Sequence, residues 1–140
     1  MTPEHTIYRL STEADEPQIQ MLRDGDVPRA FPTVVAERDG KIIGFLGTHA
    51  LPNGIVAGPL TVDLPSDRAR GIVALRLIQT YEFILMQAPG ITSYLYSVDG
   101  DAPWAAATGR CDRTHYIGEV DGLQWFERRL PVPQPSPTVH

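Results

Sequence analysis

The sequence predicts one α+β domain, built on a mixed sheet whose strands are mostly antiparallel. Two hairpin turns support this prediction, because Asp39-Gly40 and Asp121-Gly122 each separate two segments of strand composition. The third observation is a long apolar pattern at helical spacing, from about residue 68 to residue 86 or 87, which Pro89-Gly90 ends. Strand segments precede and follow this helix, so a right-handed crossover is expected to join two neighbouring parallel strands.

The remaining elements follow from local signals. Strand composition is found in residues 6–10, 33–38, 41–50, 55–64, 92–98 and 115–130, the last of which form the second hairpin. Gly58-Pro59 interrupts the fourth of these segments, so a bulge or a bend is expected there. One short helix is expected to start after Ser11 or Thr12 and to run through residue 22. Another is expected after Asp101, with Pro103 in its first turn.

Composition limits the classes of protein to which the chain can belong. It has 140 residues and a net charge of -5, which fits one domain and argues against general binding to nucleic acid or anionic membranes. The N-terminus lacks the pattern of a signal peptide, and no apolar run reaches the ~20 residues of a membrane helix. The single cysteine, Cys111, excludes an internal disulfide and favours a cytoplasmic setting. Residues 1–130 are expected to form the domain, and the proline-rich residues 131–140 a disordered tail.

The segment DRARGIV, residues 67–73, lies where a predicted strand meets the long helix. The first amides of a helix have no acceptor inside the helix, and the helix dipole favours negative charge at that end. Arg68 and Arg70 add positive charge, and Gly71 allows a ligand to approach the backbone. These features predict a phosphate or pyrophosphate site. The alternative is a helix N-terminus with two solvated arginines.

The order of the elements and this segment resemble the GNAT superfamily of acyl-CoA-dependent N-acetyltransferases. The family has a pyrophosphate loop of the pattern Q/R-x-x-G-x-G/A between its fourth strand and the long helix. Arg68 and Gly71 match the first and fourth positions of this pattern. Val73 departs from the last position, and it either points into the core or narrows the site. Val62 and Pro65 resemble the V-x-P segment that often precedes the loop, with one more residue between them.

The resemblance implies that the fourth and fifth strands, near residues 59–64 and 92–98, splay apart in a V that holds acetyl-CoA. It implies direct transfer of an acyl group to a primary amine of a small molecule or a protein. A backbone N–H of the fourth strand would polarise the thioester carbonyl. Homodimerisation through the last hairpin is also in keeping with the family. The residues implied in cofactor binding are Leu60, Thr61, Val62, Arg68, Ala69, Arg70, Gly71, Ile72 and Val73.

The catalytic residues are less well defined by the resemblance. In many GNAT enzymes the acid is a tyrosine, and its position falls on Ala106 or Thr108 in this chain. The candidates for catalytic roles are therefore Tyr116 and Ser97, and packing at the sheet edge is the alternative for Tyr116. The alternative function is a GNAT-fold binding or assembly module without transferase activity.

Several other reactive side chains have a simpler structural interpretation. Tyr94 and Tyr96 lie two residues apart on a strand and therefore share one face. Glu82 lies among apolar residues of the long helix and is expected to pair with an arginine. No pattern of metal ligands is visible in the sequence. The candidate bases, each also explained as a solvated or packed residue, are Asp63, Glu37 and His49.

Overall fold

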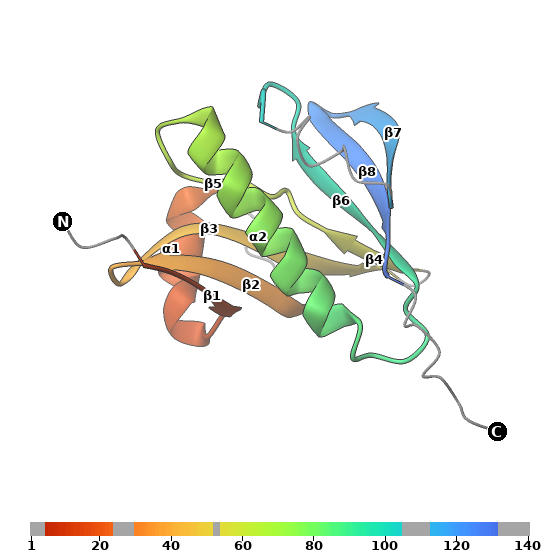
Figure 1. Cartoon of the computed structure of the whole chain (residues 1–140), viewed down its shortest axis with the longest axis horizontal. Coiled ribbons are helices and arrows are strands. Elements are labelled where there is room, and N and C mark those ends of the chain that lie inside the picture. The colour runs from red at the N-terminus through yellow and green to blue at the C-terminus, as the bar shows by residue number, and fades with distance from the viewer. Residues whose placement is uncertain (1–4, 24–29, 52–53, 105–112, 132–140) are drawn as a thin grey trace, which may run out of the picture.

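The computed structural model describes residues 5–23, 30–51, 54–104 and 113–131. In these residues eight strands form one sheet in the order β1-β2-β3-β4-β6-β8-β7, and β5 pairs with β3 beside this path (Figure 1). All pairs are antiparallel except β4 with β6, so the predicted mixed, mostly antiparallel sheet is confirmed. The strands are β1 (Thr6–Leu10), β2 (Ala30–Arg38), β3 (Lys41–Leu51), β4 (Gly54–Ala57), β5 (Thr61–Val62), β6 (Ser93–Asp99), β7 (Thr114–Val120) and β8 (Leu123–Arg129).

The helices lie on opposite faces of the sheet, with α1 (Glu16–Leu22) behind it and α2 (Asp67–Leu85) in front in Figure 1. The bounds of α2 confirm the predicted long helix. A 3-10 turn, η1 (Glu13–Asp15), precedes α1, and the Thr12 N–H donates to Asp15 Oδ2 at 2.7 Å. Within the described ranges, neither helix has the length and hydropathy needed to cross a membrane.

Both predicted hairpin turns are confirmed by backbone geometry. Asp39 and Gly40 have φ angles of 51° and 78°, and Asp121 and Gly122 have φ angles of 52° and 77°. Two successive residues with positive φ are typical of the tight turn that suits the twist of a hairpin. The short helix expected after Asp101 is not seen in residues 101–104, which form turns, and residues 105–112 lie outside the described part of the chain. Of the predicted tail, only Pro131 is described.

The fourth predicted strand is broken at the expected place. β4 ends at Ala57, Gly58 has a φ of 106°, and the chain resumes as β5 at Thr61. A side chain at position 58 would place Cβ 2.9 Å from both the backbone oxygen and Oγ of Ser97, so glycine is required by conformation and by space. Before this bend β4 pairs in parallel with β6, Val56 opposite Leu95, which confirms the predicted pairing of neighbouring parallel strands.

The core has two parts, one on each face of the sheet. The larger part packs α2 against the sheet, and the smaller packs Ile19 of α1 against Phe45. A bulge in β3 determines which side chains of this strand enter each part. Gly44 is opposite Ala36 and Ile42 is opposite Glu37, so Ile43 is the extra residue. Because of this insertion, Ile42 joins the α1 side and Ile43 joins the α2 side.

One ion pair is buried between α2 and β8. Glu82 and Arg128 have side chains exposed by only 6% and 4%, and they are joined by two hydrogen bonds of 2.5 and 3.1 Å. Arg113 Nη1 also donates to Glu82 Oε1 at 3.3 Å. The expected arginine partner of Glu82 is therefore Arg128, which lies on the strand that faces the helix rather than on the helix itself.

Candidate functional site

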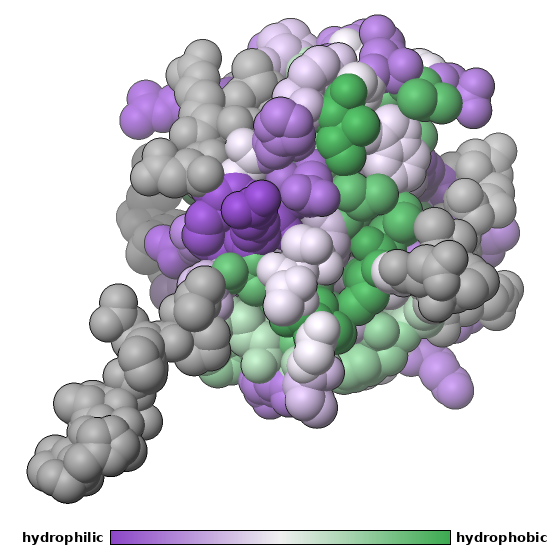
Figure 2. Space-filling model, turned by 90° about the vertical axis from the view of Figure 1, so that its right-hand side faces the viewer, coloured by the Kyte–Doolittle hydropathy of each residue, from purple (hydrophilic) through white to green (hydrophobic). Residues whose placement is uncertain are grey.

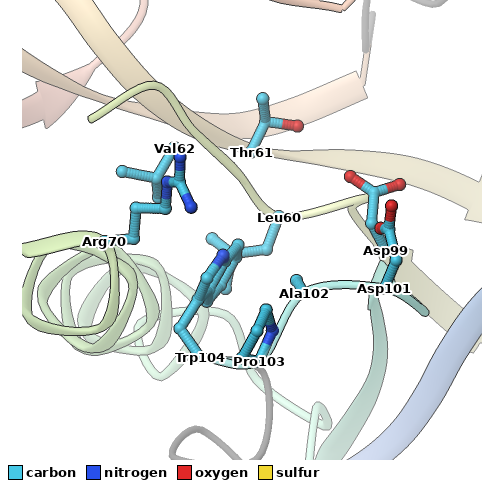
Figure 3. A pocket seen from close by; sticks show the side chains of 9 residues that line it. All are labelled: Leu60, Thr61, Val62, Arg70, Asp99, Asp101, Ala102, Pro103 and Trp104. Atoms are coloured by element: carbon cyan, nitrogen blue, oxygen red, sulfur yellow. The ribbon is translucent and has the colours of Figure 1, made fainter. Parts of the chain in front are cut away.

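A cavity of about 250 Å³ lies between β5, the first turns of α2 and the chain that follows β6. Figure 3 shows its lining from close by. The cavity joins three segments that are far apart in the sequence, at the point where the fourth strand breaks. The lining residues are Leu60, Thr61, Val62, Arg70, Asp99, Asp101, Ala102, Pro103 and Trp104.

The backbone of β5 leaves a peptide group directed at this cavity. The N–H of Leu60 donates to the Ser97 oxygen at 2.8 Å, and the N–H of Asp63 donates to the Ile43 oxygen of β3 at 2.7 Å. Peptide groups of an antiparallel strand point alternately to its two sides. The N–H and C=O of Val62 therefore point away from β3, to the side of the lining. Past this point β5 and β6 run apart (Figure 1).

Arg70 supplies the positive charge of the cavity. Its Nε donates to the Leu64 oxygen at 2.6 Å, and its Nη1 donates to Asp67 Oδ1 at 3.0 Å. The guanidinium side chain remains exposed by 34%. These two bonds hold Arg70 against the loop that leads into α2, and they leave further N–H groups of its fork-shaped end for a ligand.

Two carboxylates form the opposite side of the cavity. In Figure 3 Asp99 and Asp101 lie close together and away from Arg70. Asp99 ends β6 and accepts two hydrogen bonds, of 2.9 and 3.0 Å, from Arg23 at the end of α1. Asp101 is exposed. The cavity is therefore polarised, with a cation near α2 and carboxylates near the end of β6.

The apolar part of the lining comes from Leu60, Pro103 and Trp104. Leu60 is fully buried and Trp104 is exposed by 8%. Gly71 of α2 faces this tryptophan, since a Cβ built on Gly71 would lie 4.0 Å from Trp104 Cβ. This is an ordinary contact distance, so the helix and the tryptophan close one wall of the cavity by simple packing.

The DRARGIV segment forms the start of α2, which agrees with the start predicted near residue 68. Ser66 caps the helix, and its Oγ and backbone oxygen accept hydrogen bonds from the amides of Ala69 (3.1 Å) and Arg70 (3.0 Å). Arg68 is exposed and does not line the cavity, and Ile72 is 53% exposed. Of the residues implied in cofactor binding, the structure brings four to the cavity: Leu60, Thr61, Val62 and Arg70.

Val73 and Gly71, the remaining positions of the motif, are buried in α2. Val73 is 2% exposed and packs in the α2-side core, which decides between the two interpretations of its side chain. Gly71 lies inside the helix without a positive φ angle. The bulk of Val73 is therefore accommodated by the core.

The two catalytic candidates do not line the cavity. Ser97 is 1% exposed, and its Oγ has no hydrogen-bond partner among the described residues. Tyr116 is 52% exposed on β7, at the edge of the sheet, and its ring centroid lies 5.4 Å from that of Phe126. The position of Tyr116 agrees with the alternative of packing at the sheet edge.

The other reactive side chains have structural surroundings. Tyr94 and Tyr96 share the core face of β6, as predicted, and burial raises the pKa of Tyr94 well above its usual value. Glu37 accepts a hydrogen bond from Arg9 at 3.1 Å. Asp63 is exposed, and His49 is half-buried on β3. Ala106, Thr108 and Cys111 lie outside the described residues, and no three potential metal ligands come together in the part that is described.

Sequence reasoning did not assign Asp99, Ala102, Pro103 or Trp104 to the site. Their role depends on the chain turning back over the end of β6, which no short motif specifies. Asp101 was expected only to cap a helix. The one usable signal is the position of two aspartates and a tryptophan immediately after a predicted buried strand, where α/β folds commonly bind ligands.

Solved structures share this architecture over almost the whole chain. The ribosomal-protein-S18-alanine N-acetyltransferase from Escherichia coli superposes with a TM-score of 0.65 at 13% identity, covering 94% of this chain and 98% of its own. A GNAT family acetyltransferase from Staphylococcus aureus gives 0.67 at 9% identity, covering 91% of this chain and 100% of its own. The chain has the GNAT fold.

A third structure with the GNAT fold contains a bound cofactor. The PaiA N-acetyltransferase from Thermoplasma acidophilum, in complex with coenzyme A, has a TM-score of 0.64 at 11% identity and covers 89% of this chain and 99% of its own. No family model matches the sequence, and no curated protein matches it either. The likeness is therefore one of GNAT fold rather than of sequence.

Proposed function

We propose that the chain is an acyl-CoA-dependent N-acyltransferase that uses acetyl-CoA as its donor. The observation that carries this proposal is the polarised cavity, which lies where the fourth strand of a GNAT fold breaks beside the start of α2. The likeness to the PaiA N-acetyltransferase, which was solved with coenzyme A, supports it. Acetyl-CoA, when bound, supplies the activated acyl group.

The cavity residues fit the polar parts of such a donor. Arg70 at the cavity and the exposed Arg68 in the same turn of α2 can hold phosphate groups together with the first amides of α2, where the helix dipole also favours an anion. The peptide group of Val62, directed at the cavity, can pair with an extended amide chain or polarise a carbonyl oxygen. Thr61, Leu60 and Trp104 would enclose the rest.

We expect the carboxylate side of the cavity to hold the acceptor amine. Asp99 and Asp101 would attract a protonated amine of a small molecule or a protein. Asp101 is the better candidate to accept the proton, because Arg23 binds Asp99 and no arginine of the described residues is hydrogen-bonded to Asp101. Transfer would be direct, since Ser97 does not line the cavity. Tyr116 remains a candidate acid, and the Tyr116→Phe variant tests it by its turnover.

The second candidate is a GNAT-fold module that binds CoA without transferring an acyl group. It is favoured by one observation: no tyrosine lines the cavity among the described residues. We keep the cytoplasm as the proposed location, and we keep a homodimer through β7 as a proposal that sedimentation of the purified chain would test. The two candidates differ in turnover, not in cofactor binding.

Calorimetric titration of acetyl-CoA into the full chain tests the proposal. We expect micromolar binding that Arg70→Gln weakens about tenfold, as for loss of one charge-assisted contact to phosphate. Arg76→Gln, which removes an exposed arginine elsewhere on α2, is the matched control and should bind normally. Absence of binding at millimolar acetyl-CoA would overturn both candidates. Binding without turnover on a panel of amines would leave the binding module.

A further inference from the structure

A second cavity, of about 460 Å³, lies at the opposite end of β6 from the first. It is formed where the chain enters β6, where β7 begins and where β8 ends. The two cavities share no lining residue. The second one is lined by Ile91, Thr92, Ser93, Arg113, Arg129, Leu130 and Pro131.

Two arginines face each other across neighbouring strands at this cavity. The N–H of Arg129 donates to the Arg113 oxygen at 2.8 Å, and Arg113 Nη1 donates to the Arg129 oxygen at 2.7 Å. Like charges directly opposite each other in a sheet are unfavourable unless an anion separates them. Such a pair at the mouth of a cavity therefore favours an anionic ligand.

The protein itself balances this charge only in part. Glu82 lies 3.3 Å from Arg113 but makes its two main bonds with the buried Arg128. Arg129 is exposed, and its guanidinium has no hydrogen bond or ion pair with any residue in the described ranges. Arg113 and Arg128 thus share one carboxylate, and the Arg129 side chain pairs with none in the described ranges, in a chain whose net charge is -5. The excess positive charge is therefore located where β7 begins and β8 ends.

The rest of the cavity is suited to a small apolar group. Leu130 is 7% exposed and its N–H donates to the Thr92 oxygen at 2.9 Å, which fixes the position of this lining residue. Ile91 and Pro131 continue this apolar wall. The face on which the β6–β8–β7 end of the sheet lies has a strongly hydrophilic cluster directly beside a hydrophobic patch (Figure 2).

We propose that this cavity binds a small organic carboxylate, with its charged group on Arg129 and Arg113 and its hydrocarbon part on Leu130 and Ile91. A planar guanidinium matches the two oxygens of a carboxylate, and Arg113 shares the charge of Glu82 with Arg128. The volume is within the range of about 300–1,000 Å³ found for sites of small ligands. The site is independent of acyl transfer.

Backbone amide NMR spectra of the full chain, recorded during titration with hexanoate, test this proposal. We expect saturable shifts at Thr92, Ser93 and Leu130 in the low millimolar range, with hexanamide, the neutral analogue, binding at least about tenfold more weakly. Arg129→Gln should weaken hexanoate binding about fivefold or more, because its charge is lost at an exposed position that does not affect folding. Arg76→Gln, which makes the same charge change far from this cavity, is the control.

Three outcomes would overturn the proposal. Absence of shifts at these amides would mean that the cavity takes no carboxylate. Equal binding of hexanoate and hexanamide would mean that only the apolar wall is used. Tighter binding of inorganic phosphate than of hexanoate would assign the arginines to a phosphate ligand instead.

Discussion

The two ends of α2 use charge in different ways. Near its start, Arg70 pairs with Asp67 one turn away, and these side chains are exposed by 34% and 54%. Near its end, Glu82 pairs with Arg128 of a distant strand, and both are almost fully buried. An exposed pair contributes little to stability, whereas breaking a buried one is costly. The comparison teaches that the helix is anchored at one end and available for ligands at the other.

The largest expected effect comes from breaking the anchored end. Glu82→Gln leaves Arg128 buried without its carboxylate, and we expect the free energy of unfolding to fall by about 3–5 kcal/mol. Urea denaturation measures this change. The double variant Glu82→Leu/Arg128→Leu should lose much less, because no charge remains buried. A loss below about 1 kcal/mol in the single variant would contradict the comparison.

The next effect concerns the bend that opens the first cavity. Gly58→Ala forces a side chain into a φ of 106° and into contact with Ser97, so we expect a loss of about 2–3 kcal/mol and weaker binding of acetyl-CoA. Gly54→Ala is the matched control, because nothing lies within 4 Å of a Cβ at that position. Equal melting temperatures for the two variants would show that the bend is not strained by a side chain.

A third prediction concerns two buried tyrosines, Tyr81 of α2 and Tyr94 of β6. Burial raises the pKa of Tyr81 to about 12, which its hydrogen bond with Thr48 offsets in part, and burial also raises the pKa of Tyr94. In the unfolded chain these groups ionise near pH 10. Their contribution to stability is therefore complete below pH 10 and is lost as the pH rises through the folded pKa.

Chemical denaturation at pH 9, 10, 11 and 12 measures this loss. Above pH 10 each buried tyrosine should lower the free energy of unfolding by about 1.4 kcal/mol per pH unit. Tyr81→Phe removes one such group, so its slope with pH should be shallower than that of the unmodified chain. Identical slopes would show that Tyr81 is ionised as easily in the folded as in the unfolded state.

The smallest effect is expected at the start of α2. Ser66→Ala removes the acceptor of the Ala69 amide, and loss of a helix cap of this kind costs about 1 kcal/mol. Ser66→Asp keeps a capping oxygen and should remain within a few tenths of a kcal/mol of the unmodified chain. Thermal unfolding of the three proteins distinguishes these outcomes. A stable Ser66→Ala variant would mean that the cap does not determine where the helix begins.

Local signals explain what could be predicted from the sequence. The Asp-Gly hairpins, the bounds of α2 and the break at Gly58 each depend on the conformational preference of one or two residues. Arg70 was identified because it lies in a recognisable motif, and the Leu60 to Val62 segment because it belongs to the strand before that motif. Tertiary contacts decided the rest. The bond between Arg23 and Asp99 joins residues 76 positions apart, and no periodicity predicts it.

The motif itself illustrates a limit of pattern matching. DRARGIV matches part of a ligand-binding loop pattern, and because Ser66 caps the helix before it, Gly71 and Val73 are helical residues, in agreement with the helix predicted from about residue 68. Gly71 has no positive φ angle, and a Cβ at this position would make only an ordinary contact with Trp104, at 4.0 Å. A capping serine one residue before a motif therefore changes which of its backbone amides are available to a ligand.

Because of the bulge at Ile43, the fold depends on the number of residues at the start of β3 as well as on their identity. Strand β3 shifts phase by one residue there, so Ile42 shares a face with Phe45, and Ile43 with Leu46, although each pair lies three residues apart. Deleting a single residue at this point would restore the regular alternation and exchange the two faces of the strand beyond it. The number of residues between the Asp39-Gly40 turn and Gly44 therefore determines which face each side chain of β3 occupies. A substitution does not change this number, so it cannot have the effect of a deletion.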